Sequence, residues 1–216
     1  MATVQNPITG RSKGKFANAI FSKWKGRNTL RSKPLEVANP QTDAQIQQRD
    51  SFAAAMAFCR SISAIVYVGF AQFRDTISEF NAFMKEAYTG WVDKSLTPPA
   101  FTFNWANLVI SKGPISVTPI DSATATDATP TVKLDYDVTV TGSGQALTDN
   151  ACAVVYNETQ DLVSYVVSGA VRSTGAVIVT MPADVATGDV LHCYLFFKQN
   201  DESAVSDSTY VSFTVA

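Results

Sequence analysis

The sequence predicts an α+β protein with an extended basic N-terminal arm, a helical middle and a C-terminal antiparallel immunoglobulin-like β-sandwich. Three observations support this prediction. Cations gather near the N-terminus, a nearly continuous apolar helical pattern fills the middle, and short runs rich in Val and Thr recur after residue 101. The chain has 216 residues, 46% of them hydrophobic, which suffices for a packed core. We expect the arm at residues 1–40, the helical segment at 41–100 and the sandwich at 101–216.

The N-terminal arm is predicted from its charge and from its interruptions. Residues 1–33 hold eight cations and no acid, whereas residues 111–216 hold twelve acids and four cations, so these regions carry about +8 and −8. Gly and Pro interrupt the arm and leave no sustained period, which favours an extended conformation. A short amphipathic helix is the alternative, since five apolar residues would share one helical face. These five are Phe16, Ala17, Ile20, Phe21 and Trp24.

A tryptophan flanked by cations makes the arm a candidate interaction site. Trp and Arg dominate the hot spots of protein interfaces, and the same pair stacks on bases of single-stranded nucleic acid. We weigh a neighbouring subunit, a phosphate backbone and a membrane surface as partners and favour the subunit; in a further alternative, Trp24 anchors the arm to its own helical domain. The residues expected at an interface with a subunit or with nucleic acid are Phe21, Lys23, Trp24, Lys25, Arg27, Arg31 and Lys33.

The helical segment is predicted from capping signals and apolar spacing. Thr42 and Gln45 form a capping box, in which each side chain satisfies a backbone amide at a helix start. A second box, Thr76 with Glu79, opens a shorter helix. Between the two boxes, residues 58–73 are apolar on nearly all sides, which indicates a helix buried between several elements.

The β-sandwich is predicted from short runs rich in Val, Thr and Tyr that Gly, Pro, Asp and Asn separate. Apolar and polar residues alternate along 132–140, which is the pattern of a half-buried strand. About seven strands at this spacing favour an antiparallel sandwich, although the tryptophan that true immunoglobulin domains place between two cysteines is absent. The runs are residues 107–111, 115–119, 132–140, 152–157, 162–168, 176–181, 190–198 and 210–215.

Seven strings follow one another along the chain: SKWKGRNTLRSKP, NPQTDAQIQQRDSF, SEFNAFM, ISKGPI, VVYN, GAVRSTGAVIVTMPAD and VLHCYLFF. Together they resemble an uncharacterised family found in Bacteroidota genomes and in their phages. The resemblance covers nearly the whole chain and implies a basic arm with a Trp-Lys-Gly core, a helical middle and a C-terminal β-sandwich. It implies no catalytic residue, and it suggests a phage or prophage setting in which such subunits serve as virion parts.

Motifs for catalysis or metal binding are weak in this sequence. His192 is the only histidine, and strand alternation points it away from Leu191 and Cys193, which favours a structural or surface role. The three cysteines lack metal spacing and are expected to be reduced, mostly buried thiols. Asp135 and Asp137 share a strand face without a loop of closely spaced oxygen ligands, so a calcium site is not favoured. We therefore predict no catalytic residue, no cofactor and no metal, and we do not expect an enzyme.

The expected function is that of a bacteriophage virion structural protein. The arm would join neighbouring subunits of a homo-oligomer in a ring, neck, tail or capsid-vertex assembly that includes other virion proteins. The acidic sandwich of a neighbour would complement the charge of the arm. One alternative is a nucleic-acid-binding virion protein that uses the basic arm. Another is a surface adhesion module that binds glycan through exposed sandwich tyrosines, for which the candidates are Tyr156, Tyr165, Tyr194 and Tyr210.

A membrane partner is not expected. The longest apolar stretch, residues 62–73, is shorter than the roughly 18 to 20 residues that a bilayer span needs. The N-terminus also lacks the apolar segment of a secretory signal. The resemblance described above implies a location in the virion, after synthesis in the cytoplasm of the host bacterium.

Overall fold

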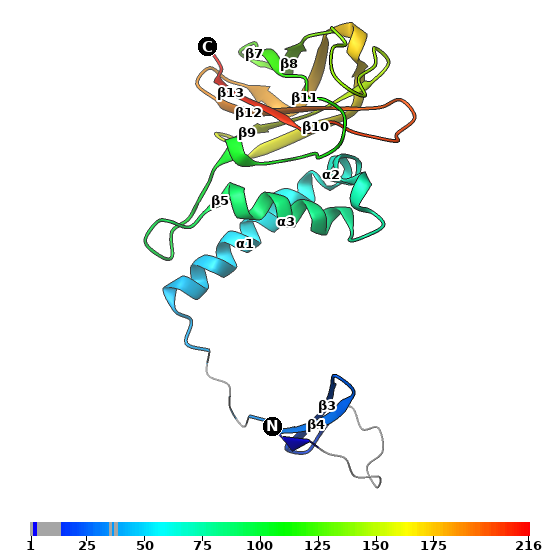
Figure 1. Ribbon diagram of the computed structural model, residues 1–216. Coiled ribbons are helices and arrows are strands. Elements are labelled where there is room, and N and C mark those ends of the chain that lie inside the picture. Colours follow the sequence, from blue (N-terminus) through cyan, green and yellow to red (C-terminus); the bar gives the residue numbers. More distant parts are fainter. Residues whose placement is uncertain (1, 4–13, 35, 37–38) are drawn as a thin grey trace. The chain divides into compact units, whose positions relative to one another are not determined.

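The chain contains both helices and antiparallel sheets, which agrees with the α+β class. The computed structural model describes residues 2–3, 14–34, 36 and 39–216 (Figure 1). The chain divides into two compact units, Met1–Thr42 and Asp43–Ala216. The expected helical segment and the expected β-region thus fall within a single unit.

The N-terminal unit is a four-stranded antiparallel sheet in the order β1-β4-β3-β2. Its strands are β1 Ala2–Thr3, β2 Gly14–Phe16, β3 Ala19–Trp24 and β4 Arg27–Ser32. The predicted extended arm and the alternative amphipathic helix are therefore both wrong for residues 14–32. Lys25 and Gly26 have φ values of 45° and 82° and form the two-residue turn between β3 and β4. Such a left-handed pair closes a hairpin because its twist matches that of the strands.

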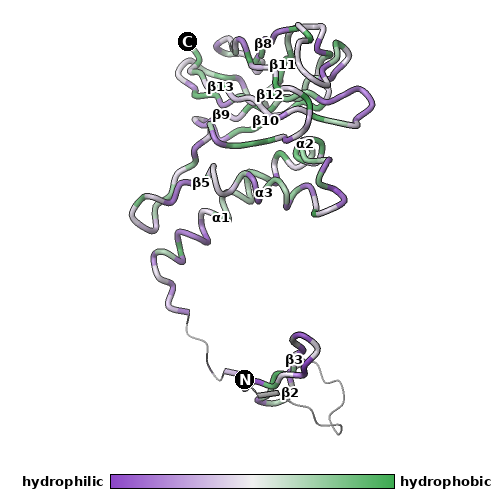
Figure 2. Tube along the Cα trace, viewed as in Figure 1, coloured by the Kyte–Doolittle hydropathy of each residue, from purple (hydrophilic) through white to green (hydrophobic). Residues whose placement is uncertain are grey.

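The second unit begins with a layer of helices: α1 Asp43–Ser61, α2 Ser63–Gly69, the 3₁₀ turn η1 Ala71–Phe73, and α3 Glu79–Trp91. The start of α1 agrees with the predicted capping box at Thr42, and Figure 2 shows that its first turns are hydrophilic. The second capping prediction is wrong in its residue. Ser78 caps α3, since its Oγ accepts the Asn81 amide at 3.4 Å, whereas Thr76 Oγ1 donates to an upstream carbonyl at 3.0 Å.

A bend separates α1 from α2. Ile62 lies at the break, is fully buried, and its carbonyl accepts the amides of Ile65 and Val66 at 3.1 and 3.2 Å. In the described part of the chain, no single helix is both long and apolar enough to cross a membrane. The α1–α2 pair meets that criterion only as a combined segment, and the two helices are bent by 82° at the break.

Two larger antiparallel sheets follow the helices. The first has the order β10-β9-β12-β13 and contains β9 Asn150–Asn157, β10 Leu162–Val171, β12 Val190–Lys198 and β13 Thr209–Thr214. The second has the order β11-β8-β7 and contains β7 Ile120–Ala125, β8 Thr129–Tyr136 and β11 Ala176–Val185. Short connecting elements are β5 Val92–Asp93, β6 Thr102–Phe103, and the 3₁₀ turns η2 Trp105–Asn107 and η3 Arg172–Thr174.

Some predicted strands are wrong. Residues 107–111 and 115–119 are mainly irregular, and β8 ends at Tyr136 rather than at residue 140. Several of the apolar side chains that suggested the first two strands are nevertheless buried, since Leu108, Ile110 and Ile115 are at most 3% exposed, whereas Val117 is 45% exposed. The first three of these residues are therefore apolar because they are buried, although they do not belong to a strand.

The β10-β9-β12-β13 sheet of the second unit is buried on both faces. Ala153 and Val155 of β9 pack in one core with β8 and β11, whereas Val154 and Tyr156 pack in a second core with the helices. Figure 1 shows the helices on one side of this sheet and the three-stranded sheet on the other. The two sheets thus share a core, and the helices cover the outer face of one sheet. The more specific immunoglobulin-like β-sandwich stays a prediction.

Candidate functional site: a basic sheet and an aromatic cavity

The N-terminal sheet carries many exposed cations. In the described residues these are Lys15, Lys23, Lys25, Arg27, Arg31 and Lys33; Arg11 and Lys13 lie outside them. No acid precedes Glu36 in the sequence. Residues 1–42 hold eight cations and one acid, a net charge of +7, and residues 43–216 hold nine cations and eighteen acids, a net charge of −9. The two units therefore carry opposite charges.

One face of the sheet gathers cations around an apolar residue. Ile20 in β3 pairs with Arg31 in β4 and with Lys15 in β2. Directly opposite residues share a face of an antiparallel sheet, so these three form a row across it. Arg27 lies on the same face, because it is an even number of residues from Arg31 along β4. The backbone therefore holds these charges at fixed spacings.

The other predicted interface residues do not join that row. The opposite face carries Phe21 and Lys23, the turn carries Lys25, and Lys33 follows the end of β4. The backbone of Trp24 pairs with Arg27, but the Trp24 side chain lies outside the described part of the structure. Sequence reasoning placed these cations together in one N-terminal segment, but it did not predict that a sheet would divide them between two faces.

The second unit contains a cavity of about 450 Å³ beside the helix layer. Its wall includes four aromatic rings, which come from α1, β6, η2 and β9. The ring centroids of Phe58 and Trp105 lie 5.2 Å apart, and those of Trp105 and Tyr156 lie 4.4 Å apart. The lining residues are Ala54, Ala57, Phe58, Ser61, Phe103, Trp105, Tyr156, Asp161 and Val163.

Asp161 places a carboxylate at this cavity. The Tyr156 hydroxyl donates a hydrogen bond to Asp161 Oδ1 at 3.0 Å. Burial raises the pKa of Tyr156 above its usual range, and the hydrogen bond and negative charge of Asp161 raise it further. Tyr156 is therefore a neutral hydrogen-bond donor at physiological pH. Asp161 itself has a φ of 54°, a left-handed conformation that Asp and Asn adopt more readily than most residues.

Polar side chains of the β10-β9-β12-β13 sheet fix the position of Trp105. The Tyr194 hydroxyl donates to the Trp105 carbonyl at 2.7 Å, and the His192 ring stacks on the indole with centroids 5.3 Å apart. His192 in turn contacts the Tyr210 hydroxyl at 2.9 Å through Nδ1 and a Glu158 carboxylate oxygen at 3.1 Å through Nε2. His192 is only 6% exposed, so these contacts fit the structural one of the two roles, structural or surface, that were expected for it.

The expected platform of exposed tyrosines is wrong. Tyr156 and Tyr194 are 8% and 0% exposed, and Tyr165 and Tyr210 are partly buried against the same core. All four lie on the sheet face that the helices cover. Periodicity could not reveal this, because the covering layer comes from residues about 100 positions away in the sequence.

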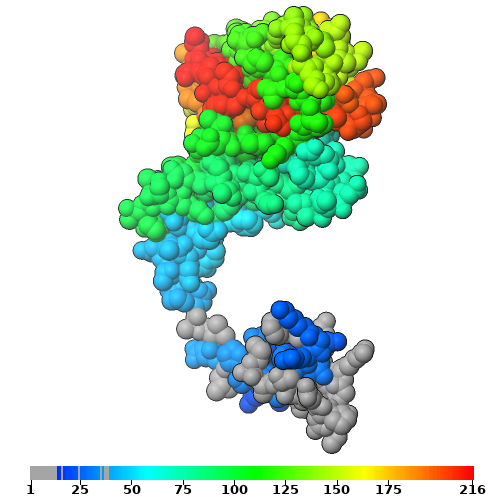
Figure 3. Space-filling model, in the orientation of Figure 1, coloured from blue at the N-terminus to red at the C-terminus, as the bar shows by residue number. Residues whose placement is uncertain are grey.

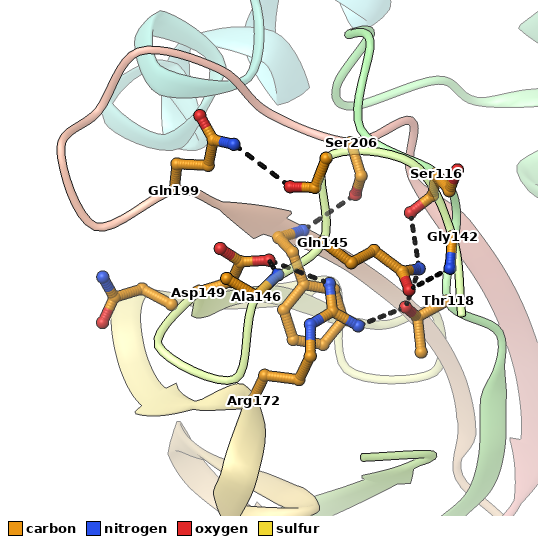
Figure 4. Close-up of polar contacts among 12 residues, drawn as sticks. Ser116, Thr118, Gly142, Gln145, Ala146, Asp149, Arg172, Gln199 and Ser206 are labelled. Carbon is orange, nitrogen blue, oxygen red and sulfur yellow. Dashed lines mark hydrogen bonds and ion pairs between the residues drawn. The ribbon is translucent and has the colours of Figure 1, made fainter. Parts of the chain in front are cut away.

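A buried ion pair joins loops to the sheets (Figure 4). Arg172 is fully buried, its Nη1 donates to Thr118 Oγ1, and its Nη2 lies 3.4 Å from Asp149 Oδ2. The guanidinium carbon lies 3.8 Å from the ring centroid of Phe197. Burial lowers the pKa of Arg172, and the Asp149 carboxylate opposes that effect. Gln145 extends the network, since its amide donates to the Ser116 carbonyl at 3.1 Å. We interpret this cluster as structural.

The aspartates considered for a calcium site form ion pairs or hydrogen bonds with other residues. Asp135 pairs with Lys133 at 2.7 Å, Asp137 accepts the Thr139 amide at 2.8 Å, and Asp149 pairs with Arg172. Within the described ranges, no group of three or more His, Cys, Asp or Glu is placed to hold a metal ion.

The three cysteines are free and buried, as the sequence predicted. Burial raises the pKa of Cys59 and of Cys193 to about 12, and it also raises that of Cys152. These thiols are therefore protonated as well as shielded.

We expect an aromatic disulfide reagent at pH 8 to label all three thiols only as the protein unfolds. Labelling in buffer should be at least about 10³-fold slower than in denaturant, since folded domains favour the native state by 10³ or more. Labelling of any thiol within seconds in buffer would show that its surroundings open locally.

The chain matches a known protein family. The model of a family of unknown function, DUF6266, matches residues 11–212 of the chain. No curated protein and no solved structure matches it. The match covers strands β2 to β4 of the basic sheet and nearly all of the unit that contains the aromatic cavity.

Proposed function

We propose that this chain, which belongs to the DUF6266 family of unknown function, is a non-enzymatic structural subunit of a phage virion. Its basic N-terminal sheet would bind neighbouring subunits in a ring, neck, tail or capsid-vertex assembly. The observation that carries the proposal is the charge of +7 on one unit and −9 on the other. The virion setting is carried over from the resemblance to Bacteroidota and phage sequences, and the immunoglobulin-like description of the two sheets from the number and spacing of the predicted strands.

A folded sheet suits binding to a protein surface better than a flexible arm does. Its cations are held at fixed spacings, so less conformational freedom is lost on binding. Charge complementarity would set the register and encounter rate, while apolar residues such as Ile20 and Phe21 would supply affinity. Folding also shortens the reach, because the residues between β4 and α1, 33–42, span at most about 35 Å. The partner is therefore expected to be an adjacent subunit.

We expect the intact protein to form a discrete oligomer that dissociates as salt is raised. Mass photometry and light scattering at low and high ionic strength would measure this. Replacing Lys23, Arg27 and Arg31 with Gln should yield a monomer, because each is an exposed cation of the sheet. The matched control replaces Arg49, Arg60 and Lys85, exposed cations of the other unit, and should leave the oligomer intact. A monomeric intact protein, or equal assembly of both triple variants, would contradict the proposal.

Nucleic acid is the second candidate partner, because Lys15, Arg27 and Arg31 share one face of the sheet. The same variants can be titrated with single-stranded and duplex DNA. A log–log salt slope of about −3 or steeper would indicate at least three or four phosphate contacts and favour this function. A shallow slope, with the oligomer formed in the absence of DNA, would favour the subunit interface.

A further inference from the structure

We propose that the aromatic cavity of the Asp43–Ala216 unit binds a small organic cation of the alkylammonium class. Nothing in the proposed assembly requires this cavity. Its volume of about 450 Å³ lies within the range of small-molecule sites. Three features of the wall support the proposal: its aromatic rings, the small residues that α1 contributes, and its single charge.

The aromatic part of the wall is rigid. Trp105 contacts Phe58 and Tyr156, and the Tyr194 hydroxyl anchors its carbonyl at 2.7 Å. Because these contacts fix the rings before a ligand arrives, little ordering is needed on binding. Aromatic rings attract cations within about 6 Å of their centroids, and several rings together are the usual site for quaternary ammonium groups.

Small side chains of α1 leave the space that the ligand would fill. Ala54, Ala57 and Ser61 line the cavity and follow one another at helical spacing, so they lie along one face of α1. Phe58 is the large side chain that this helix adds to the lining. The helix therefore supplies room as well as one aromatic ring.

The charge of the wall decides the class of ligand. Among the described lining residues, Asp161 is the only charged one, and Tyr156 fixes its carboxylate through a hydrogen bond. An anionic ligand would be repelled. A sugar would need many hydrogen-bonding partners, whereas the lining offers few polar groups: the side chains of Ser61, Tyr156 and Asp161 and the indole N–H of Trp105. A compact cation with an apolar surface matches both the rings and the carboxylate.

Isothermal calorimetry and ligand-observed NMR with the full chain would test this inference. The probes are choline and benzyltrimethylammonium, with 3,3-dimethylbutanol as the neutral isostere of choline. We expect choline to bind with a Kd of about 1 mM, as its few atoms allow, and the neutral isostere to bind at least about tenfold more weakly. Equal binding of the two, or no binding of either cation at about 50 mM, would overturn the proposal.

Two pairs of variants locate the site. Asp161→Asn keeps the left-handed backbone and an acceptor for Tyr156 but removes the charge, so choline binding should weaken about tenfold or more. Asp50→Asn removes an exposed charge of α1 outside the lining and should change choline binding by less than about twofold. Ala57→Leu should fill the cavity and abolish binding, whereas Ala53→Leu, on the same helix but outside the lining, should not. Binding that is unchanged in both Asp161→Asn and Ala57→Leu would overturn the assignment.

Discussion

Arg172→Ala is expected to lower the free energy of unfolding by about 3–5 kcal/mol, as for other buried pairs that lose one partner. Arg172 is fully buried and Asp149 is 1% exposed. Without the guanidinium, the Asp149 carboxylate would keep its backbone bond from Ala146 at 2.8 Å but would lose its buried cation. The variant also loses packing against the ring of Phe197. Urea unfolding followed by circular dichroism would measure the change.

A double-mutant cycle separates the ion pair from the packing. Asp149→Ala combined with Arg172→Ala leaves no lone buried charge from this pair, so the double variant should be more stable than the sum of the two single effects predicts. Lys133→Ala is the surface control, because Lys133 pairs with Asp135 while its own side chain is 51% exposed. That change should cost less than about 1 kcal/mol. A similar small cost for Arg172→Ala would show that the buried pair does not stabilise the fold.

Gly113→Ala is expected to cost about 3 kcal/mol, the upper end of the range for overpacking. A Cβ placed on Gly113 would lie 2.0 Å from the Val205 carbonyl oxygen and 2.8 Å from its carbonyl carbon. Backbone atoms cannot move aside as a flexible side chain can. The two segments are also tied together, since the Gly113 amide donates to Asp207 at 2.9 Å and the Ile115 amide to Val205 at 3.2 Å. Urea unfolding provides the measurement.

The Gly113 segment matters because of where it runs. On the face shown in Figure 3, the green atoms of the chain that follows α3 lie between the helix layer and the sheets. Its neighbour Lys112 donates its amide to the Gly69 carbonyl at the end of α2, at 3.1 Å. Moving Gly113 away from Val205 would thus disturb the contact between the helix layer and the sheets, as well as the local backbone.

Gly90→Ala is the matched control for Gly113. Gly90 is the next-to-last residue of α3, and a Cβ there would meet nothing closer than 3.9 Å. Ala is the better helix former, so this variant should gain about 0.5–1 kcal/mol. A loss of stability for Gly113→Ala and a gain for Gly90→Ala would show that the close approach of the backbone, rather than the replacement of a glycine as such, destabilises the protein. A neutral Gly113→Ala would mean that the two segments separate easily.

The sequence by itself determined the features that depend on local pattern. Alternation at residues 132–140 identified β8, the Thr42 capping box located the start of α1, and composition showed the opposite charges of the two ends. The turn at Lys25-Gly26 was also visible in principle, because a two-residue turn ending in Gly between alternating residues signals a hairpin. The many Gly and Pro residues of this segment favoured an extended arm, so the hairpin was not predicted.

Only the tertiary structure decided which surfaces are covered and which residues meet. Phe58, Trp105 and Asp161 lie on separate elements, yet they line one cavity. Arg172 and Thr118 are 54 residues apart and form a buried hydrogen bond. Periodicity reports whether a side chain faces a core or solvent, but it does not identify the segment that packs against it. Contacts between distant parts of the chain therefore buried the expected tyrosine platform and formed both the cavity and the buried ion pair.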